Sequence, residues 1–303
     1  MKYTKPSLSF EDQAKLLISR GLIVDSPQVL VNYLKQVNYY SLSGYWYSFK
    51  LIDPNNGDES FRPNTTFSMI RERYEFDRSL RLLLMDALEK IEVSIFRTRL
   101  VAEITMRNGC FGHALKKSYN PKFSQRSFDS LLFDIEEDEN RSKEEFISRY
   151  RSKYSDEKYL PFWMAAELMS YGQLFTVYKN ADIKIKQGIS REFSIYPPVL
   201  DSWLHTLNYI RNACAHHTRL WNKPLPLAPM IPDYHHDNRW YQPVRIDNSR
   251  IFIVLVIIKY LLNTIQNGHN WNNSVQQLLT SYPQIPLRDM GFPGGWENLE
   301  LWK

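Results

Sequence analysis

Apolar residues recur at spacings of three and four along most of this chain, as they do in amphipathic helices. The longest such stretch runs from residue 66 to about residue 106 and contains no proline or glycine, so it predicts one long central helix. Two shorter helices are expected before it, at residues 9–21 and 27–37, because each begins with a serine suited to capping. No convincing alternating strand pattern stands out. The sequence therefore predicts an all-α fold.

The chain is expected to have two parts. Residues 1–58 should form an N-terminal helical segment, whose aromatic stretch at 38–51 packs onto the main body. Residues 53–58 are rich in Pro, Asn, Gly and Asp, which marks a loop and the best boundary. Residues 59–303 should form the main helical domain, and within it residues 124–158 carry charges of both signs and predict a solvated helical excursion.

After residue 160 the pattern predicts helices from Pro161 to about residue 193, a helix at 197–220, and an irregular proline-rich connection. The strongest apolar run, at 251–258, is shorter than the ~20 residues that a bilayer crossing needs, so a buried helix at 250–266 is expected. Residues 1–6 lack the apolar core of a signal peptide, and the chain has only 2 cysteines. These features predict a cytoplasmic protein with no membrane partner.

The most informative segment is Arg211-Asn212-Ala213-Cys214-Ala215-His216, on the helix expected at 197–220. Histidine, with an ordinary pKa of ~6.5, can move a proton either way near neutral pH, and arginine offers a planar cation that matches phosphate oxygens. Such a pair suits cleavage of a phosphodiester without a metal. Arg211 and His216 lie ~140° apart around a helix, so they converge only if the arginine bends round or a second copy faces the first. The spacing therefore favours a dimeric site.

Polar residues also form a stripe of their own on this helix. The stripe is separate from the apolar one, and it indicates either a site or a buried polar seam. Its members are His205, Asn208, Asn212 and His216.

Several segments of the chain resemble one family. The block at 203–222, which contains the motif, resembles the signature of the Abi-like family of bacterial abortive-infection proteins, the AbiD/AbiF group of the HEPN superfamily. Further blocks resemble the opening, the central helix and the segment before the catalytic helix of that family. They lie at residues 5–13, 20–23 and 39–46, at 74–81 with 91–93, and at 160–168 with 171–172.

The resemblance implies an all-α, HEPN-type helical bundle with an N-terminal helical extension. It also implies a phage-defence or toxin-type, metal-independent endoribonuclease that acts as a homodimer on RNA. His216 is then the general base or acid, Arg211 stabilises charge on the phosphoryl oxygens, and Asn212 positions His216 or the phosphate. His205 and Glu92 are possible supporting residues. An antitoxin or a regulatory RNA stays an open possibility.

Basic residues follow the motif closely. Arg219 and Lys223 flank Trp221, an arrangement that can hold phosphates and stack a base, and the net charge of +5 is compatible with a polyanionic partner. An equal alternative is that these cations stabilise the C-terminal end of the helix.

Other constellations are weaker. The string from Arg107 to His113 contains two glycines, so its likeness to the motif is interpreted as coincidence. No paired histidine or cysteine spacing supplies metal ligands from one element, and no glycine-rich phosphate loop is present, so neither a metal nor a cofactor is expected. The alternative to an enzyme is a non-catalytic HEPN-like module that binds RNA or a protein.

Overall fold

A computed structural model describes residues 2, 6–55, 57–266 and 268–303 of the chain. The described chain is predominantly helical, which confirms the all-α prediction. Residues 1 and 3–5, on which the expectation about a signal peptide partly depends, lie outside the described residues, as does part of the family-like block at 5–13.

The N-terminal part contains the two predicted short helices and one small sheet that was not predicted. Its elements are α1 (Phe10–Ser19), α2 (Pro27–Gln36), α3 (Tyr39–Trp46), η1 (Tyr47–Phe49), β1 (Lys50–Ile52) and β2 (Glu59–Phe61). The two strands are antiparallel, with Lys50 opposite Phe61. Strands of three residues are too short to show alternation, which is why the sequence pattern missed them. The predicted loop at 53–58 falls between these strands in the sequence, and its residue 56 lies outside the described residues.

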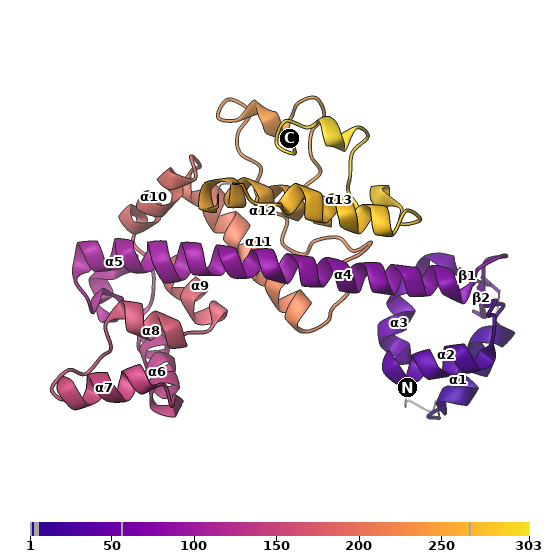
Figure 1. The fold of residues 1–303 in the computed structure, drawn as a ribbon, viewed down its shortest axis with the longest axis horizontal. Helices are drawn as coiled ribbons and strands as arrows, with labels where there is room; N and C mark the ends of the chain where they lie inside the picture. Colours follow the sequence, from indigo (N-terminus) through magenta and orange to yellow (C-terminus); the bar gives the residue numbers. More distant parts are fainter. Residues whose placement is uncertain (1, 3–5, 56, 267) are drawn as a thin grey trace.

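The predicted central helix is confirmed, and it has an internal irregularity. It consists of α4 (Phe67–Glu92), a π-helical segment η2 (Val93–Leu100) and α5 (Val101–Asn108). Thr66 caps its start, because the Thr66 hydroxyl accepts the N–H of Met69 at 3.3 Å. Figure 1 shows this helix running the length of the molecule, with α1 to α3 gathered at one end.

The charged segment after α5 is helical, as predicted. It forms α6 (Gln125–Arg141) and α7 (Glu145–Lys153), beyond two short turns, η3 (Gly112–Ala114) and η4 (Lys116–Ser118). Next come α8 (Phe162–Leu168), α9 (Tyr171–Asn180) and α10 (Ile183–Glu192), in the region where helices were expected. Helices α8, α9 and α10 all pack against η2.

The motif helix is shorter than predicted. It is α11 (Pro197–Ala215), so it ends five residues before the expected position of residue 220. The remaining elements are η5 (Asn238–Trp240), α12 (Ile251–Ile265), α13 (Trp271–Ser281), η6 (Leu287–Met290) and η7 (Trp296–Asn298). The buried helix predicted at 250–266 is α12. Within the described part of the chain, no helix has both the length and the hydropathy that a bilayer crossing requires.

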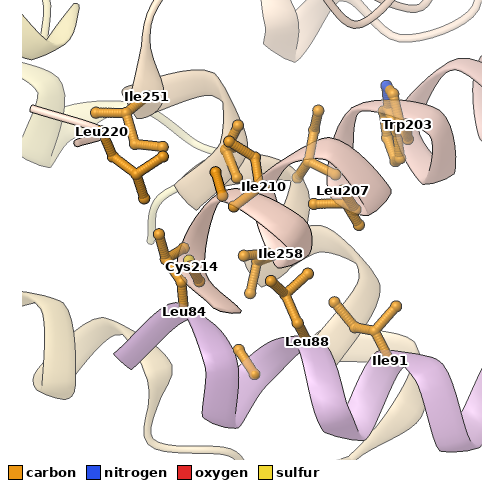
Figure 2. Packing of buried hydrophobic residues seen from close by; sticks show 14 of the residues in the cluster. Leu84, Leu88, Ile91, Trp203, Leu207, Ile210, Cys214, Leu220, Ile251 and Ile258 are labelled. Carbon is orange, nitrogen blue, oxygen red and sulfur yellow. The ribbon is translucent and has the colours of Figure 1, made fainter. Parts of the chain in front are cut away.

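The core lies where α11 crosses α4. Figure 2 shows Leu84 and Leu88 of α4 next to Cys214 of α11 and Ile258 of α12. All four side chains are at most 4% exposed. A buried leucine or isoleucine contributes roughly 1.5–3 kcal/mol, so this crossing fixes the motif helix on the central helix.

One buried carboxylate connects three separate segments. Asp77 of α4 is fully buried and accepts the hydroxyl of Tyr45 at 2.6 Å and the N–H of Trp221 at 2.7 Å. It also accepts the N–H of Leu220 at 3.1 Å and pairs with Arg81 one turn along α4. Burial raises the pKa of Asp77, and Arg81, Tyr45 and the two amides oppose that rise. We call this arrangement the Asp77 hub.

Replacing Asp77 should therefore cost far more stability than replacing an exposed aspartate. Asp77→Asn leaves the Arg81 guanidinium buried without its counter-charge, and we expect a loss of about 3 kcal/mol or more in urea denaturation. The matched control is Asp86→Asn, which removes an exposed pair with Lys90 on the same helix and should cost about 0.5 kcal/mol or less. Equal losses in the two variants would contradict the hub.

His113, from the second Arg-Asn…His string, is a core residue. Its side chain is fully buried, stacks on Phe162 at 4.8 Å between ring centres, and makes no hydrogen bond to the described residues. Burial lowers the pKa of His113 to about 4. This environment agrees with the interpretation of that string as coincidence.

Protonation of His113 should destabilise the fold at mildly acidic pH. Its pKa is ~6.5 in the unfolded chain and about 4 in the folded protein, so the unfolded state binds more protons between these values. The free energy of unfolding is therefore unaffected by His113 above pH ~6.5. It falls as the pH drops toward 4, by on the order of 3 kcal/mol in total. His113→Phe should flatten this part of the curve of unfolding free energy against pH. Parallel curves for the two proteins would show that His113 is not the titrating group.

Candidate active site

The motif residues lie near the C-terminal end of α11. Asn212 begins the last turn, Arg211 comes directly before it, and His216 is the C-cap, with its N–H donating to the carbonyl of Asn212 at 2.9 Å. His217 then takes a left-handed conformation, with φ of 56°, which turns the chain out of the helix. Arg211 is half-buried, whereas Asn212 and His216 are exposed. The prediction of an unbroken helix through His216 to residue 220 was thus wrong.

Tyr171, the first residue of α9, connects the motif to the central helix. The Arg211 guanidinium lies 5.8 Å from the centre of the Tyr171 ring. Burial raises the pKa of the Tyr171 phenol, the Glu92 carboxylate raises it further, and Arg211 lowers it. The Tyr171 hydroxyl is buried and has no hydrogen-bond partner among the described residues. Tyr171 therefore contacts Arg211 of α11 and feels the charge of Glu92 at the end of α4.

Glu92 is held in this place by an ion pair. Its carboxylate lies 3.0 Å from the Arg97 guanidinium, and both side chains are mostly buried. Arg97 also donates to the carbonyls of Ala166 and Met169, which bracket the end of α8. Because Arg97 belongs to η2, the π-helical segment is what brings α4, α8 and α9 to the same point. Irregular helical turns of this kind recur at functional sites.

Asn208 lies one turn before Arg211 on the same helix. Its side-chain oxygen is buried and has no partner among the described residues. Unpaired buried acceptors are uncommon and costly in folded proteins. The polar stripe predicted on this helix is therefore buried in its middle, at Asn208, and open at its end, at Asn212 and His216.

His205 lies apart from the end of the motif. Its ring stacks on Phe175 of α9, with centres 5.6 Å apart, and borders a hollow of about 270 Å³ together with Lys179 and Asp201. Eleven residues separate His205 from His216, which is roughly 16 Å along a helix. The structure thus leaves His205 distant from His216, while Glu92 pairs with Arg97 and influences Tyr171, the residue that Arg211 contacts.

Most side chains predicted to bind RNA in the segment after the motif make contacts within the protein. Trp221 is 1% exposed, and Arg73 of α4 lies over its ring at 4.7 Å, so no face of the ring is open to a base. Arg219 donates to the carbonyl of Gly44 in α3 and does not cap α11. Lys223 is half-exposed. Of the three residues predicted to bind RNA, Lys223 is the one left with neither a buried ring nor an internal hydrogen bond among the described residues.

No role was assigned from the sequence to three residues that shape this part of the structure. Tyr171, Asp77 and Arg97 received no role, although Tyr171 and Asp77 both lie inside the family-like blocks. The signal that could have found them is a polar residue on an otherwise apolar helix face within these blocks, because such a residue often has a buried partner. Among the described residues, no group of three or more His, Cys, Asp or Glu side chains is arranged to hold a metal ion.

A comparison with protein families agrees with the resemblance in the sequence. A family model described as Abi-like protein matches residues 32–222, which is more than half of the chain. The match extends from α2 through the motif and includes Glu92, Tyr171 and the Asp77 hub. Neither a curated protein nor a solved structure matches the chain. The chain therefore belongs to the Abi-like family, and this membership assigns it to abortive infection, a form of phage defence.

Proposed function

We propose that this Abi-like protein is a metal-independent endoribonuclease of the HEPN type, active in the cytoplasm on RNA. The observation that carries the proposal is the position of Arg211, Asn212 and His216 at the open end of α11, with the Tyr171 ring beside Arg211. This end combines an exposed imidazole with a guanidinium held in a defined place. Those are the groups that phosphodiester cleavage by an internal hydroxyl requires.

In the reaction, the RNA 2′-hydroxyl attacks the adjacent phosphorus and loses its proton to a base. The bond from phosphorus to the 5′-oxygen breaks, and that oxygen receives a proton from an acid, which leaves a 2′,3′-cyclic phosphate and a 5′-hydroxyl. His216 serves as the base or the acid, and Arg211 stabilises the negative charge on the phosphoryl oxygens. Asn212, also exposed, positions His216 or the phosphate. DNA lacks the 2′-hydroxyl and is at most bound.

Two protomers would supply one histidine for each proton transfer. Arg211 and His216 point ~140° apart around the axis of α11, and Arg211 already contacts Tyr171 of its own chain. A second copy, related by a two-fold axis, would place its His216 opposite the first Arg211. The proposed active species is thus a homodimer with the C-terminal ends of α11 facing each other.

One observation favours the alternative of a non-catalytic RNA-binding or protein-interaction module. Arg211 is half-buried and lies over the Tyr171 ring, a contact that stabilises the packing of α11 on α9 whether or not RNA is cleaved. An antitoxin or a regulatory RNA would be a natural partner of such a module. Cleavage assays separate the two possibilities.

We expect the purified protein to cut single-stranded RNA in the presence of EDTA and to leave 2′,3′-cyclic phosphate ends. His216→Ala and Arg211→Ala should each lower the rate on the order of 10²-fold or more, through loss of a proton carrier or of a charge stabiliser. The matched control is His217→Ala, an exposed neighbour that should keep its activity. Cleavage that requires a divalent ion and leaves 3′-hydroxyls would rule the mechanism out, and undiminished RNA binding without cleavage would favour the alternative.

If the active species is a homodimer, two inactive variants should complement each other. When an Arg211→Ala chain is mixed with a His216→Ala chain, each heterodimer regains one site with both groups, and part of the activity should return. Homodimers of either variant should stay inactive in the same assay. A fully active monomer in sedimentation at the assay concentration would show that one chain holds the complete site.

A further inference from the structure

A buried lysine stands out on the apolar helix α12. Lys259 is 4% exposed and lies among fully buried isoleucines and leucines. Its ammonium makes no hydrogen bond or ion pair with the described residues, and its pKa is affected by burial without any opposing charged partner. Its position is more than one turn before the end of α12, so it does not cap that helix. A buried ammonium without a counter-ion is costly, and burial lowers the pKa of Lys259 accordingly.

Lys259 borders a hollow between the end of α12 and the start of α13. The hollow encloses about 360 Å³ and is lined also by Asn263, His269, Asn272 and Lys303. It adjoins a second hollow of about 250 Å³, where Asp86 and Lys90 of α4 are paired. Volumes in this range are typical of sites for small ligands.

The N-terminal end of α13 faces this hollow. Asn270 is its N-cap residue but makes no capping hydrogen bond with its side chain. Across the described chain, no acceptor pairs with the backbone N–H of Asn272 or Asn273, in the first turn of α13. Free N–H groups at a helix start carry a partial positive charge and bind anions well.

His269 lies in the same hollow, and the positive charges of Lys259 and Lys90 act on it. Its Nδ1 accepts the N–H of Trp271 at 3.2 Å, so the ring is neutral and its Nε2 donates to Asn263 at 2.7 Å. Burial lowers the pKa of His269, and the charges of Lys259 and Lys90 lower it further. Asp86 lines the smaller hollow, and its charge is already matched by Lys90.

Asn272 adds a second kind of contact. Its side-chain nitrogen donates to the carbonyl of Trp302, which fixes the orientation of the amide. Its side-chain oxygen is buried and lacks a partner among the described residues. A molecule that filled the hollow would thus need an anionic group for Lys259 and a hydroxyl or amino donor for Asn272.

We propose that this hollow binds a phosphorylated small molecule of nucleotide size. The phosphate would lie on Lys259 and the first N–H groups of α13, and a hydroxyl or amino group of the ligand would donate to Asn272. This ligand site is separate from the motif, because α13 packs on α4 whereas the Arg211 contact is made by α9. Binding here does not depend on RNA cleavage.

The test is calorimetric titration of the full chain with adenosine 5′-monophosphate, inorganic phosphate and adenosine. We expect the nucleotide to bind at one site and to raise the Tm, and Lys259→Met to weaken its binding about tenfold or more. Lys259→Met keeps the apolar stem and should make the unliganded protein more stable, since it removes an unpaired buried charge. The matched control is Lys122→Met, an exposed lysine before α6, which should bind as the natural protein does.

A second measurement needs no variant. Reductive methylation of lysines, read by mass spectrometry, should be slowed at Lys259 by the nucleotide and unchanged at Lys122. Three results would overturn the proposal: no binding at millimolar concentration, equal binding by the natural protein and Lys259→Met, or adenosine binding as tightly as its phosphate. Inorganic phosphate binding as tightly as the nucleotide would refute the proposed ligand size. Binding of a 5′-phosphorylated RNA through Lys259 without binding of the mononucleotide would identify an RNA end instead.

Discussion

The fully buried carboxylate of Asp77 is the constraint on which the arrangement of this protein depends. It is satisfied by four donors, which come from α3, from α4 itself and from the two residues where the chain leaves the motif. Apolar packing of α11 on α4 is strong but not directional, and it would tolerate sliding of one helix along the other. A carboxylate that must accept the N–H groups of Leu220 and Trp221 allows one register, so the hub fixes where the exposed end of α11 points.

The contacts of Arg211 follow from that register. Helix α9 packs on α11, and its first residue, Tyr171, contacts Arg211. Glu92 at the end of α4 pairs with Arg97 of η2, the segment on which α9 also packs. The candidate site is therefore built on helical elements, with His216 as the C-cap of α11 just before the left-handed turn at His217. Groups held in this manner keep their geometry without a bound ligand, which is the arrangement that charge stabilisation in catalysis favours.

Periodicity predicted most of the helices because they bury an apolar stripe, as α4 does, and α12 was found from its continuous apolar run, which is buried on all sides. It could not predict the end of α11, since no proline or glycine occurs between Arg211 and Lys223. That end is fixed by the left-handed turn at His217 and by the hydrogen bonds of Asp77, a partner 143 residues away from Leu220. Trp221 was misjudged for the same reason: an aromatic residue among cations resembles a base-stacking residue until α4 is seen to cover it.

Cys214 lies inside the motif and next to the hub, and its burial has a practical consequence. The side chain is 4% exposed, and burial raises the pKa of its thiol to about 12. Because the thiolate is the reactive form, the folded protein offers almost none of it to alkylating or oxidising reagents at neutral pH. Cys110, which is half-exposed, is open to them from the start. The rate at which Cys214 is labelled would thus report how often α11 separates from the central helix and the core opens.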